Sequence, residues 1–295
     1  MTIDPPPGTA EELEPGLVRI RCDNPSPMTH TGTMSYLVGQ NEVAVIDPGP
    51  LNEAHLDALL AAIGGRPVVA VLVTHAHLDH SPLSHPLADS VGAPILAFGR
   101  AEDGRSETMA ALAAAGLAGG GEGVDRDFRP DRRLADGEAL TVDGDVVRAF
   151  HTPGHMANHL AFQWRDSVFS GDLVMGWAST LISPPDGDLS AFLASCDRLK
   201  ALGAARFYPG HGAPIDDPAA RIDWLVAHRH DRTRQILEAL PGTPAEIVAR
   251  VYADTPRELW PAAERNVFAH LVFLVAEGRA TARPDLSPTA WFDRP

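Results

Sequence analysis

Apolar and polar positions along the first half of the chain predict short strands separated by turns. Three strands are predicted, at residues 17–20, 35–38 and 43–46. Asn52 is a suitable N-cap for an amphipathic helix that ends at residue 63, before a pair of glycines. The continuous apolar run at residues 68–73 then predicts a buried strand. The order is therefore a meander, a helix and a further strand.

The second half of the chain repeats this order of strands followed by a helix. Four strands are predicted, at residues 140–142, 146–150, 160–164 and 168–170. A helix at residues 189–202 and a last strand at 206–208 follow. Because the apolar faces of both sets of strands must be buried, we expect two sheets packed face to face with helices outside.

Between the two halves, the pattern of residues 99–136 loses its regular period. A helix at 81–91 and a strand at 94–97 lead into this stretch, which is rich in Ala, Gly and charged residues and contains Gly119-Gly120-Gly121. We expect an excursion over the surface, which is either a lid over an active site or an insertion without function.

The two ends of the chain differ from the middle. Residues 1–16 are rich in Pro and acidic residues and predict a loose leader. Residues 17–217 form the predicted main domain. Residues 218–295 form a small C-terminal domain, for which helices are predicted at 221–240, 243–252 and 256–277 and a hairpin at 278–284. Three helices and a hairpin resemble a winged helix.

Composition narrows the class of protein. With 295 residues, of which 44% are hydrophobic, the chain has ample length for a core. Cys22 and Cys196 lie far apart, which indicates neither a disulfide framework nor a thiolate zinc site. The sequence contains no run of about 18 apolar residues and no basic segment followed by an apolar one at the N-terminus. We therefore expect a cytoplasmic protein that does not enter a membrane.

The net charge of -15 lies on the main domain, because residues 218–295 carry ten arginines and ten acidic residues. An acidic surface disfavours nonspecific attraction to nucleic-acid phosphates or anionic lipids. Bound cations could still create a local positive field that draws an anionic group into one cleft.

Four candidate metal ligands directly follow the predicted strand at 68–73. They are His75, His77, Asp79 and His80. His75 and His77 are two residues apart, so an extended backbone points both the same way, and the other two fall in the next turn. Imidazoles and carboxylates suit zinc or another borderline divalent cation, and two pairs of ligands suit two cations side by side.

Three later segments place a ligand-type residue on a turn after a predicted strand. They are Thr-Pro-Gly-His, ending at His155, Ser-Gly-Asp, ending at Asp172, and Pro-Gly-His-Gly, which contains His211. Gly and Pro fix the geometry of a turn, and metal coordination tolerates only small errors in ligand position. The sequence therefore predicts that these residues join the first cluster.

Taken in order, these four motifs resemble the metallo-β-lactamase fold superfamily over residues 17–215. The resemblance implies an α/β fold, a four-layer αββα sandwich, with two divalent metal ions at one edge. Zinc is the first expectation, and manganese or iron are alternatives. The resemblance assigns His75, His77 and His155 to one ion, Asp79, His80 and His211 to the other, and Asp172 to both.

This assignment implies hydrolysis by a hydroxide that bridges the ions, because zinc lowers the pKa of bound water from near 16 to about 7. Asp79 could also orient the nucleophile. His159 stands four residues after His155, where this family often keeps a histidine, and we expect it to position a ligand or to donate a proton, with plain packing as the alternative. His30, in the loop at 28–33, is a candidate substrate contact.

The substrate is less well defined by the sequence. Asp172 stands where antibiotic-hydrolysing members commonly place a cysteine, so β-lactamase activity is not expected. The segments at 31–39, 208–237 and 266–278 are similar to the β-lactamase-like protein 2 group, which carries a C-terminal winged-helix-like domain and whose animal member cleaves single-stranded RNA. That resemblance favours a phosphodiester substrate, with single-stranded RNA as the first candidate.

Two other hypotheses stay open. One is a hydrolase of a small thioester, ester or lactone, similar to glyoxalase II, whose tail only closes the pocket. The other is a nucleic-acid-binding regulator with a vestigial metal domain. The arginines at 229, 232 and 234 form the best local basic cluster, but Asp231 lies among them and a salt-bridged helix face would explain them equally well.

Overall fold

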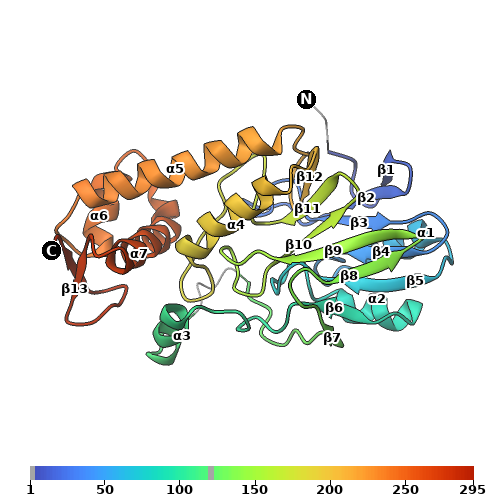
Figure 1. Ribbon diagram of the computed structural model, residues 1–295, viewed down its shortest axis with the longest axis horizontal. Coiled ribbons are helices and arrows are strands. Elements are labelled where there is room, and N and C mark those ends of the chain that lie inside the picture. Colours follow the sequence, from blue (N-terminus) through green and yellow to red (C-terminus); the bar gives the residue numbers. More distant parts are fainter. Residues whose placement is uncertain (1–3, 119–122) are drawn as a thin grey trace.

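The computed structural model describes residues 4–118 and 123–295, and its main part is built on two facing sheets (Figure 1). The strands of the first sheet are ordered as in the sequence: β1 (Ala10–Glu14), β2 (Leu17–Arg21), β3 (Met34–Val38), β4 (Val43–Ile46), β5 (Val68–Leu72), β6 (Ile95–Ala97) and β7 (Arg132–Arg133). Strands β1 to β4 form an antiparallel meander, and β4 to β7 are parallel. The predicted meander and the predicted buried strand are therefore found in this sheet, and the predicted helix lies between β4 and β5 in the chain.

The second sheet has the order β12-β11-β10-β9-β8. Its strands are β8 (Ala139–Val142), β9 (Asp145–His151), β10 (Leu160–Trp164), β11 (Ser167–Gly171) and β12 (Arg206–Pro209). Neighbouring strands are antiparallel except β11 and β12, which are parallel. The parallel pair brings the carboxyl ends of β11 and β12 to the same edge of the sheet.

Strand β4 shows why the apolar runs are continuous rather than alternating. Ala44 and Ile46 pack into the core between the two sheets, whereas Val43 and Val45 pack on the other face with residues of α1 (Glu53–Ile63) and α2 (Ser84–Val91). A strand buried on both faces needs apolar residues at every position.

The outer face of the second sheet is covered in the same way. Val168 and Phe207 pack with Phe192 and Leu199 of α4 (Leu189–Ala201) and with Leu225 of α5 (Pro218–Glu238). The layers are thus helix, sheet, sheet and helix, which confirms the predicted αββα sandwich.

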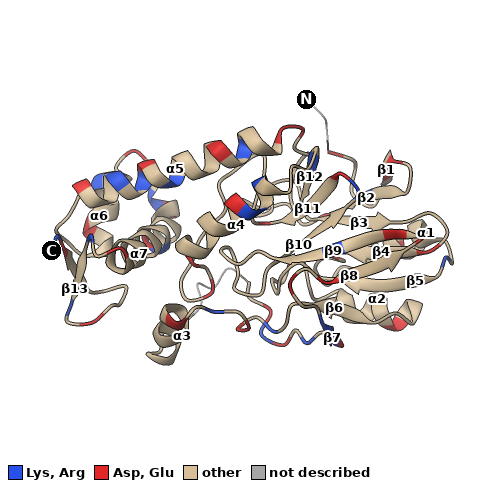
Figure 2. Cartoon of the chain, in the orientation of Figure 1, with Lys and Arg blue, Asp and Glu red and all other residues tan. Residues whose placement is uncertain are grey.

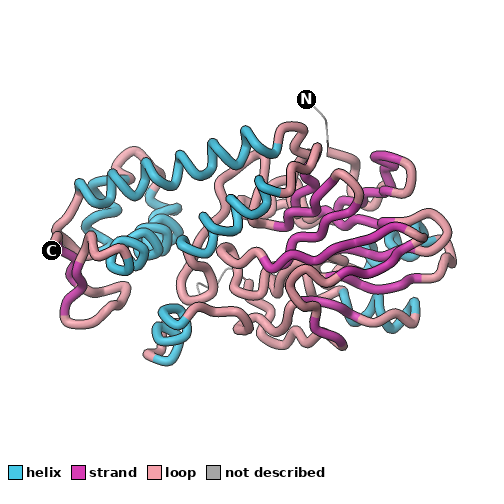
Figure 3. Tube along the Cα trace, viewed as in Figure 1, coloured by secondary structure: helices cyan, strands magenta, loops and turns pink. Residues whose placement is uncertain are grey.

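The C-terminal segment has a core of its own beside the sandwich (Figure 3). After α5 it contains α6 (Pro244–Val251), the short 3₁₀ helix η1 (Arg257–Leu259), α7 (Trp260–Ala276) and the antiparallel pair β13 (Thr281–Arg283) and β14 (Trp291–Asp293). Ile236, Phe268 and Phe292 are buried together there. None of the helices in the described parts of the chain is long and apolar enough to cross a membrane.

The prediction of a loose leader over residues 1–16 is wrong for residues 10–14, which form β1; residues 1–3 lie outside the described residues. β1 is an edge strand whose residues are exposed or half-buried. Its sequence therefore lacks the regular apolar positions from which a buried strand is predicted. Glu11 pairs with the buried Arg19 of β2, and their Oε2 and Nη2 atoms are 2.6 Å apart. The backbone pairing with β2, this ion pair and the packing of Leu13 against the core attach the strand.

The described part of the excursion at 99–136 is attached to the rest of the chain at several places, among them the Arg105–Asp186 ion pair and the hydrogen bond from Ser81 Oγ to Asp125 Oδ2. Its helix α3 (Glu107–Ala114) packs Met109 and Leu112 into the C-terminal core, and β7 pairs with β6. The three glycines at 119–121 lie outside the described residues. The described part of the excursion is thus a connection between the sandwich and the C-terminal segment.

Candidate metal centre

The ligand-type residues lie where strands of the two sheets end. His75, His77, Asp79 and His80 follow β5, Asp172 directly follows β11, and His211 follows β12. His155 lies in the loop between β9 and β10. Strand ends hold these residues on a rigid frame, which keeps the side chains close to one geometry.

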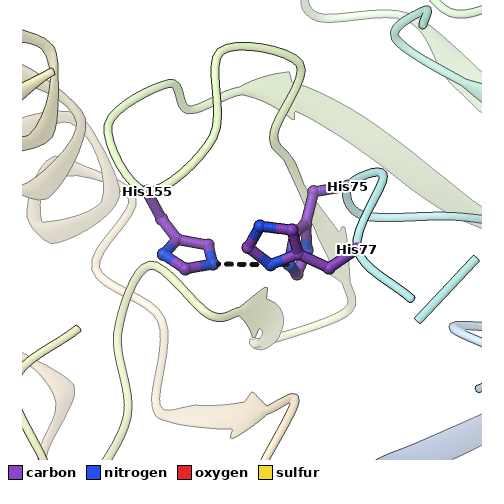
Figure 4. A group of neighbouring side chains, drawn as sticks. All are labelled: His75, His77 and His155. Carbon is purple, nitrogen blue, oxygen red and sulfur yellow. Dashed lines mark hydrogen bonds between the residues drawn. The ribbon is translucent and has the colours of Figure 1, made fainter. Parts of the chain in front are cut away.

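Three histidines converge in one group (Figure 4). His77 Nδ1 lies 3.0 Å from His75 Nε2 and 3.1 Å from His155 Nε2. Burial lowers the pKa of His77 to about 3, holds that of His75 well below its usual range and lowers that of His155. Neutral imidazoles keep a free lone pair, which is the form that binds a metal ion.

A second group combines two histidines with two carboxylates. Its members are Asp79, His80, Asp172 and His211, and their ligand atoms all lie within 4.8 Å of one another. His211 Nε2 is 3.1 Å from Asp79 Oδ2 and 3.3 Å from Asp172 Oδ2. Asp172 Oδ2 is also 3.8 Å from His155 Nε2, so this carboxylate touches both groups.

Charge is balanced inside the second group. Burial would lower the pKa of His211, but Asp172 and Asp79 raise it to about 9. Burial would raise the pKa of both carboxyls, yet His80 and His211 hold the pKa of Asp79 and of Asp172 well below the usual range. Two ionised carboxylates in a buried site are a suitable environment for a divalent cation.

The outer nitrogens of the imidazoles are held by oxygen atoms. Asp47 Oδ2 lies 2.9 Å from His80 Nδ1 and also accepts from the Thr74 hydroxyl at 2.7 Å. Leu181 O lies 2.9 Å from His155 Nδ1, and Gly32 O lies 3.2 Å from His211 Nδ1. Such contacts fix the tautomer and the orientation of a metal-binding histidine.

Asp47 is a member of this arrangement that the sequence analysis missed. It follows β4 in the segment Asp47-Pro48-Gly49 and has a φ of 50°. The signal was the same as for the other candidates, a ligand-type residue beside Pro and Gly directly after a strand. Its neighbours place it behind His80, where it supports that side chain.

His159 is completely buried and packs against the three-histidine group. Its ring lies 5.2 Å from that of His75, and its Nδ1 is 2.9 Å from the Thr152 hydroxyl. Burial holds its pKa well below the usual range. These contacts place His159 behind the three-histidine group, and its role there stays a prediction.

A small cavity that opens to solvent lies over the ligand-type residues. His77, Asp79, His155 and Asp172 line its floor. Apolar parts of the wall come from Met28, Val124, Met156, Met175 and Leu181, and polar parts from Thr180, Ser183 and Asp186. Among the described residues, no lysine or arginine lines this cavity.

His30 lies near this cavity but is not one of the lining residues. Its ring stacks on that of Trp177, with 4.8 Å between the centroids. This contact joins the loop that contains Met28 to the loop that contains Met175. His30 therefore connects two walls of the cavity.

Comparison with known proteins agrees with this geometry. Residues 28–211 match the Metallo-beta-lactamase superfamily, and residues 243–291 match the Beta-lactamase associated winged helix domain. The chain belongs to the metallo-β-lactamase superfamily and carries the associated winged helix domain. It is a hydrolase of that superfamily, which confirms the family, fold and enzyme class predicted from the sequence.

Individual relatives cover most of the chain. A beta-lactamase-like protein 2 homolog from Drosophila melanogaster is 32% identical in an alignment of 286 positions that covers 90% of this chain and 90% of that protein. An atrochrysone carboxyl ACP thioesterase from Aspergillus fumigatus is 30% identical over 271 residues, covering 84% of this chain and 76% of that protein. The crystal structure of a metallo-beta-lactamase family protein from Thermus thermophilus has a TM-score of 0.76 at 28% identity and covers 96% of this chain and 100% of that one.

Proposed function

We propose that this chain is a dinuclear metal hydrolase of small thioesters or esters. His75, His77 and His155 would hold one ion, Asp79, His80 and His211 would hold the other, and Asp172 lies within reach of both groups. Residues 17–217 carry this chemistry, and residues 218–295 form the attached winged-helix domain. When two divalent ions such as zinc are bound, they supply an activated water and polarise the carbonyl oxygen under attack.

The choice of substrate class rests on the side chains that line the cavity. Its apolar side chains suit an uncharged acyl group, and methionines adapt to irregular shapes. No lysine or arginine is among the described residues that line the cavity, so only bound ions would offset the negative charge of a phosphodiester. The related fungal thioesterase supports an acyl substrate as well.

Asp79 is the carboxylate best placed to orient the attacking water. Its side chain is 23% exposed, whereas that of Asp172 is 8% exposed, and both line the cavity. A carboxylate open to the cavity accepts a hydrogen bond from a water molecule and so orients it. Asp79 thus acts on the nucleophile as well as holding an ion.

Single-stranded RNA is the alternative substrate, and α5 carries the basic cluster that the sequence offered for it. Figure 2 shows positive and negative residues mixed along α5 rather than a basic track. Arg234 pairs with Asp231 and Glu238, and Arg232 lies over the Tyr252 ring. These arginines are already engaged within the protein, so the geometry favours the acyl substrate.

The test is a direct comparison of substrates. Protein loaded with zinc or manganese is offered a hydroxyacyl thioester such as S-lactoylglutathione, a set of lactones and labelled single-stranded RNA. We expect thioester turnover with two ions per chain by metal analysis. Asp79→Ala and His80→Ala should lower kcat/KM by about 1000-fold or more, because loss of an ion removes several kcal/mol of transition-state stabilisation.

The matched control is His85→Ala, which removes an exposed imidazole of α2 and should keep wild-type turnover. Cleavage of RNA alone, lost in Asp79→Ala, would replace the acyl substrate by the phosphodiester. Failure of every substrate, together with salt-sensitive DNA binding, would instead favour the regulator hypothesis.

A further inference from the structure

Helix α5 binds the loop that leads from β11 to α4. Figure 1 shows α5 running beside α4, against which it packs. Arg221 donates from Nε to Met175 O and from Nη2 to Ala178 O, both at 2.7 Å. Arg229, eight residues further along, donates from Nη2 to Thr180 O. Three backbone carbonyls of one loop are therefore held by two arginines of one helix.

Arg229 is a buried cation. It is 2% exposed, its second donor Nη1 lies 3.3 Å from Asn266 Oδ1 of α7, and its guanidinium lies over the Phe192 ring. Burial lowers its pKa to about 10, which still leaves it charged at neutral pH. Because removing a charge from water is costly, the contact with Thr180 O is a specific arrangement rather than part of a solvated helix face.

The loop held by Arg229 contacts one of the candidate metal ligands. Thr180 Oγ1 lies 3.1 Å and Leu181 O lies 2.9 Å from His155 Nδ1. The other ring nitrogen of His155 faces His77. The direction of the His155 imidazole thus depends on residues 180 and 181, whose position depends in turn on Arg229.

We propose that Arg229 is a positioning residue that sets the metal affinity of the three-histidine group through Thr180 and His155. The C-terminal segment, from α5 onward, therefore has a function in the metal centre although it supplies none of the seven proposed ligands. This inference rests on the proposed metal centre but not on the choice of substrate.

The first experiment measures metal affinity in Arg229→Met, which keeps a long apolar side chain but removes every donor. We expect zinc affinity at the three-histidine group to fall by about 10- to 100-fold, as is typical when a partner of a metal-binding histidine is lost. The ion at the second group should stay. Competition with a chromogenic chelator gives the two dissociation constants, and cobalt absorption reports the geometry of each site.

Arg232→Met is the matched control, because it removes an arginine from the same helix. Arg232 binds Gln235 Oε1 at 3.0 Å and lies over Tyr252, away from the loop. Its variant should bind both ions as the wild type does. Arg229→Lys, which keeps one charge and can reach one carbonyl, should recover part of the lost affinity.

Thr180→Val completes the test because it removes the hydroxyl that contacts His155 but keeps the carbonyl that Arg229 binds. If both side chains act through His155, the losses of zinc affinity in the two single variants should not add in the double variant. Thermal unfolding of the metal-free proteins shows whether each variant is folded.

Three results would contradict the inference. Wild-type affinity at both groups in a folded Arg229→Met protein would show that the loop does not depend on this contact. Equal loss at both groups, in proportion to reduced stability of the metal-free protein, would show a structural role alone. A wild-type chain that bound no ion would overturn the proposed function together with this inference, whereas the first two results leave the proposed function intact.

Discussion

At the scale of single residues, His55 shows how burial creates a dependence of stability on pH. It is 2% exposed, and its Nε2 lies 2.8 Å from Ser35 Oγ, whose own proton is donated to Asp47 O. His55 must therefore donate from Nε2, and within the described chain its Nδ1 has no partner. A proton on Nδ1 would place an unpaired charge in the core, and burial lowers the pKa of His55 to about 4.

The expected effect appears on acidification. Because the folded pKa lies below the ordinary value of 6.5, the unfolded chain binds a proton that the folded chain excludes. The stability from His55 is complete above pH 6.5 and is lost as the pH falls toward 4, at up to about 1.4 kcal/mol per pH unit. His55→Gln keeps a donor for Ser35 but does not titrate, so it should reduce this slope.

Urea unfolding of metal-free protein at several pH values between neutrality and the acid range measures the slope. His85→Gln serves as the control because it removes an exposed imidazole. An equal slope in the wild type and in His55→Gln would show that His55 is protonated without cost in the folded chain.

At the scale of elements, the strands next to the metal centre were predictable and some contacts between distant elements were not. β4, β5 and β11 lie inside the sandwich, so their apolar runs are unambiguous, and turns with Gly or Pro mark the ligands that follow. β1 escaped prediction because the residues of this edge strand are exposed or half-buried and lack regular apolar positions. Arg229 was seen only as part of a surface cluster, because helical periodicity does not show which loop a helix covers.

The turn after β12 gives a prediction of its own. A Cβ atom at Gly210 would lie 2.5 Å from Asp172 Oδ1 and 2.6 Å from His80 Cε1. The backbone there cannot move away easily, because Gly210 donates to Gly171 O at 2.9 Å and accepts from Met34 N at 2.8 Å. Gly210→Ala should therefore displace two proposed ligands of the second group.

We expect Gly210→Ala to lose the second ion, to reduce turnover by at least about 100-fold and to lower the free energy of unfolding by about 1–3 kcal/mol. Gly176→Ala is the control, since its Cβ would meet Ile215 at an ordinary 3.5 Å. Metal analysis, turnover and urea unfolding check these effects. Two ions per chain in folded Gly210→Ala would show that the turn adapts and that the close approach is not required.

At the scale of the whole molecule, the excursion and the C-terminal segment form one body with the sandwich. Met109 and Leu112 of α3 pack into the C-terminal core, and Leu225 and Ala269 of the C-terminal helices pack with the outer layer of the second sheet. These contacts link segments far apart in the chain, which no local pattern in the sequence encodes. They also keep α5 against the loop that contacts His155.

The net charge of -15 gives a prediction that separates the two substrate classes. An anionic RNA strand approaches an acidic molecule against repulsion, and raising the salt from about 0.01 to about 0.1 M shortens the screening length from about 30 to about 10 Å. Any RNA cleavage should therefore speed up severalfold in kcat/KM over this range. Hydrolysis of an uncharged lactone from the same substrate set should change little, because no long-range force acts on it. Initial rates at constant metal concentration measure both, and RNA cleavage that slows with added salt would reveal a basic binding track and favour the phosphodiester.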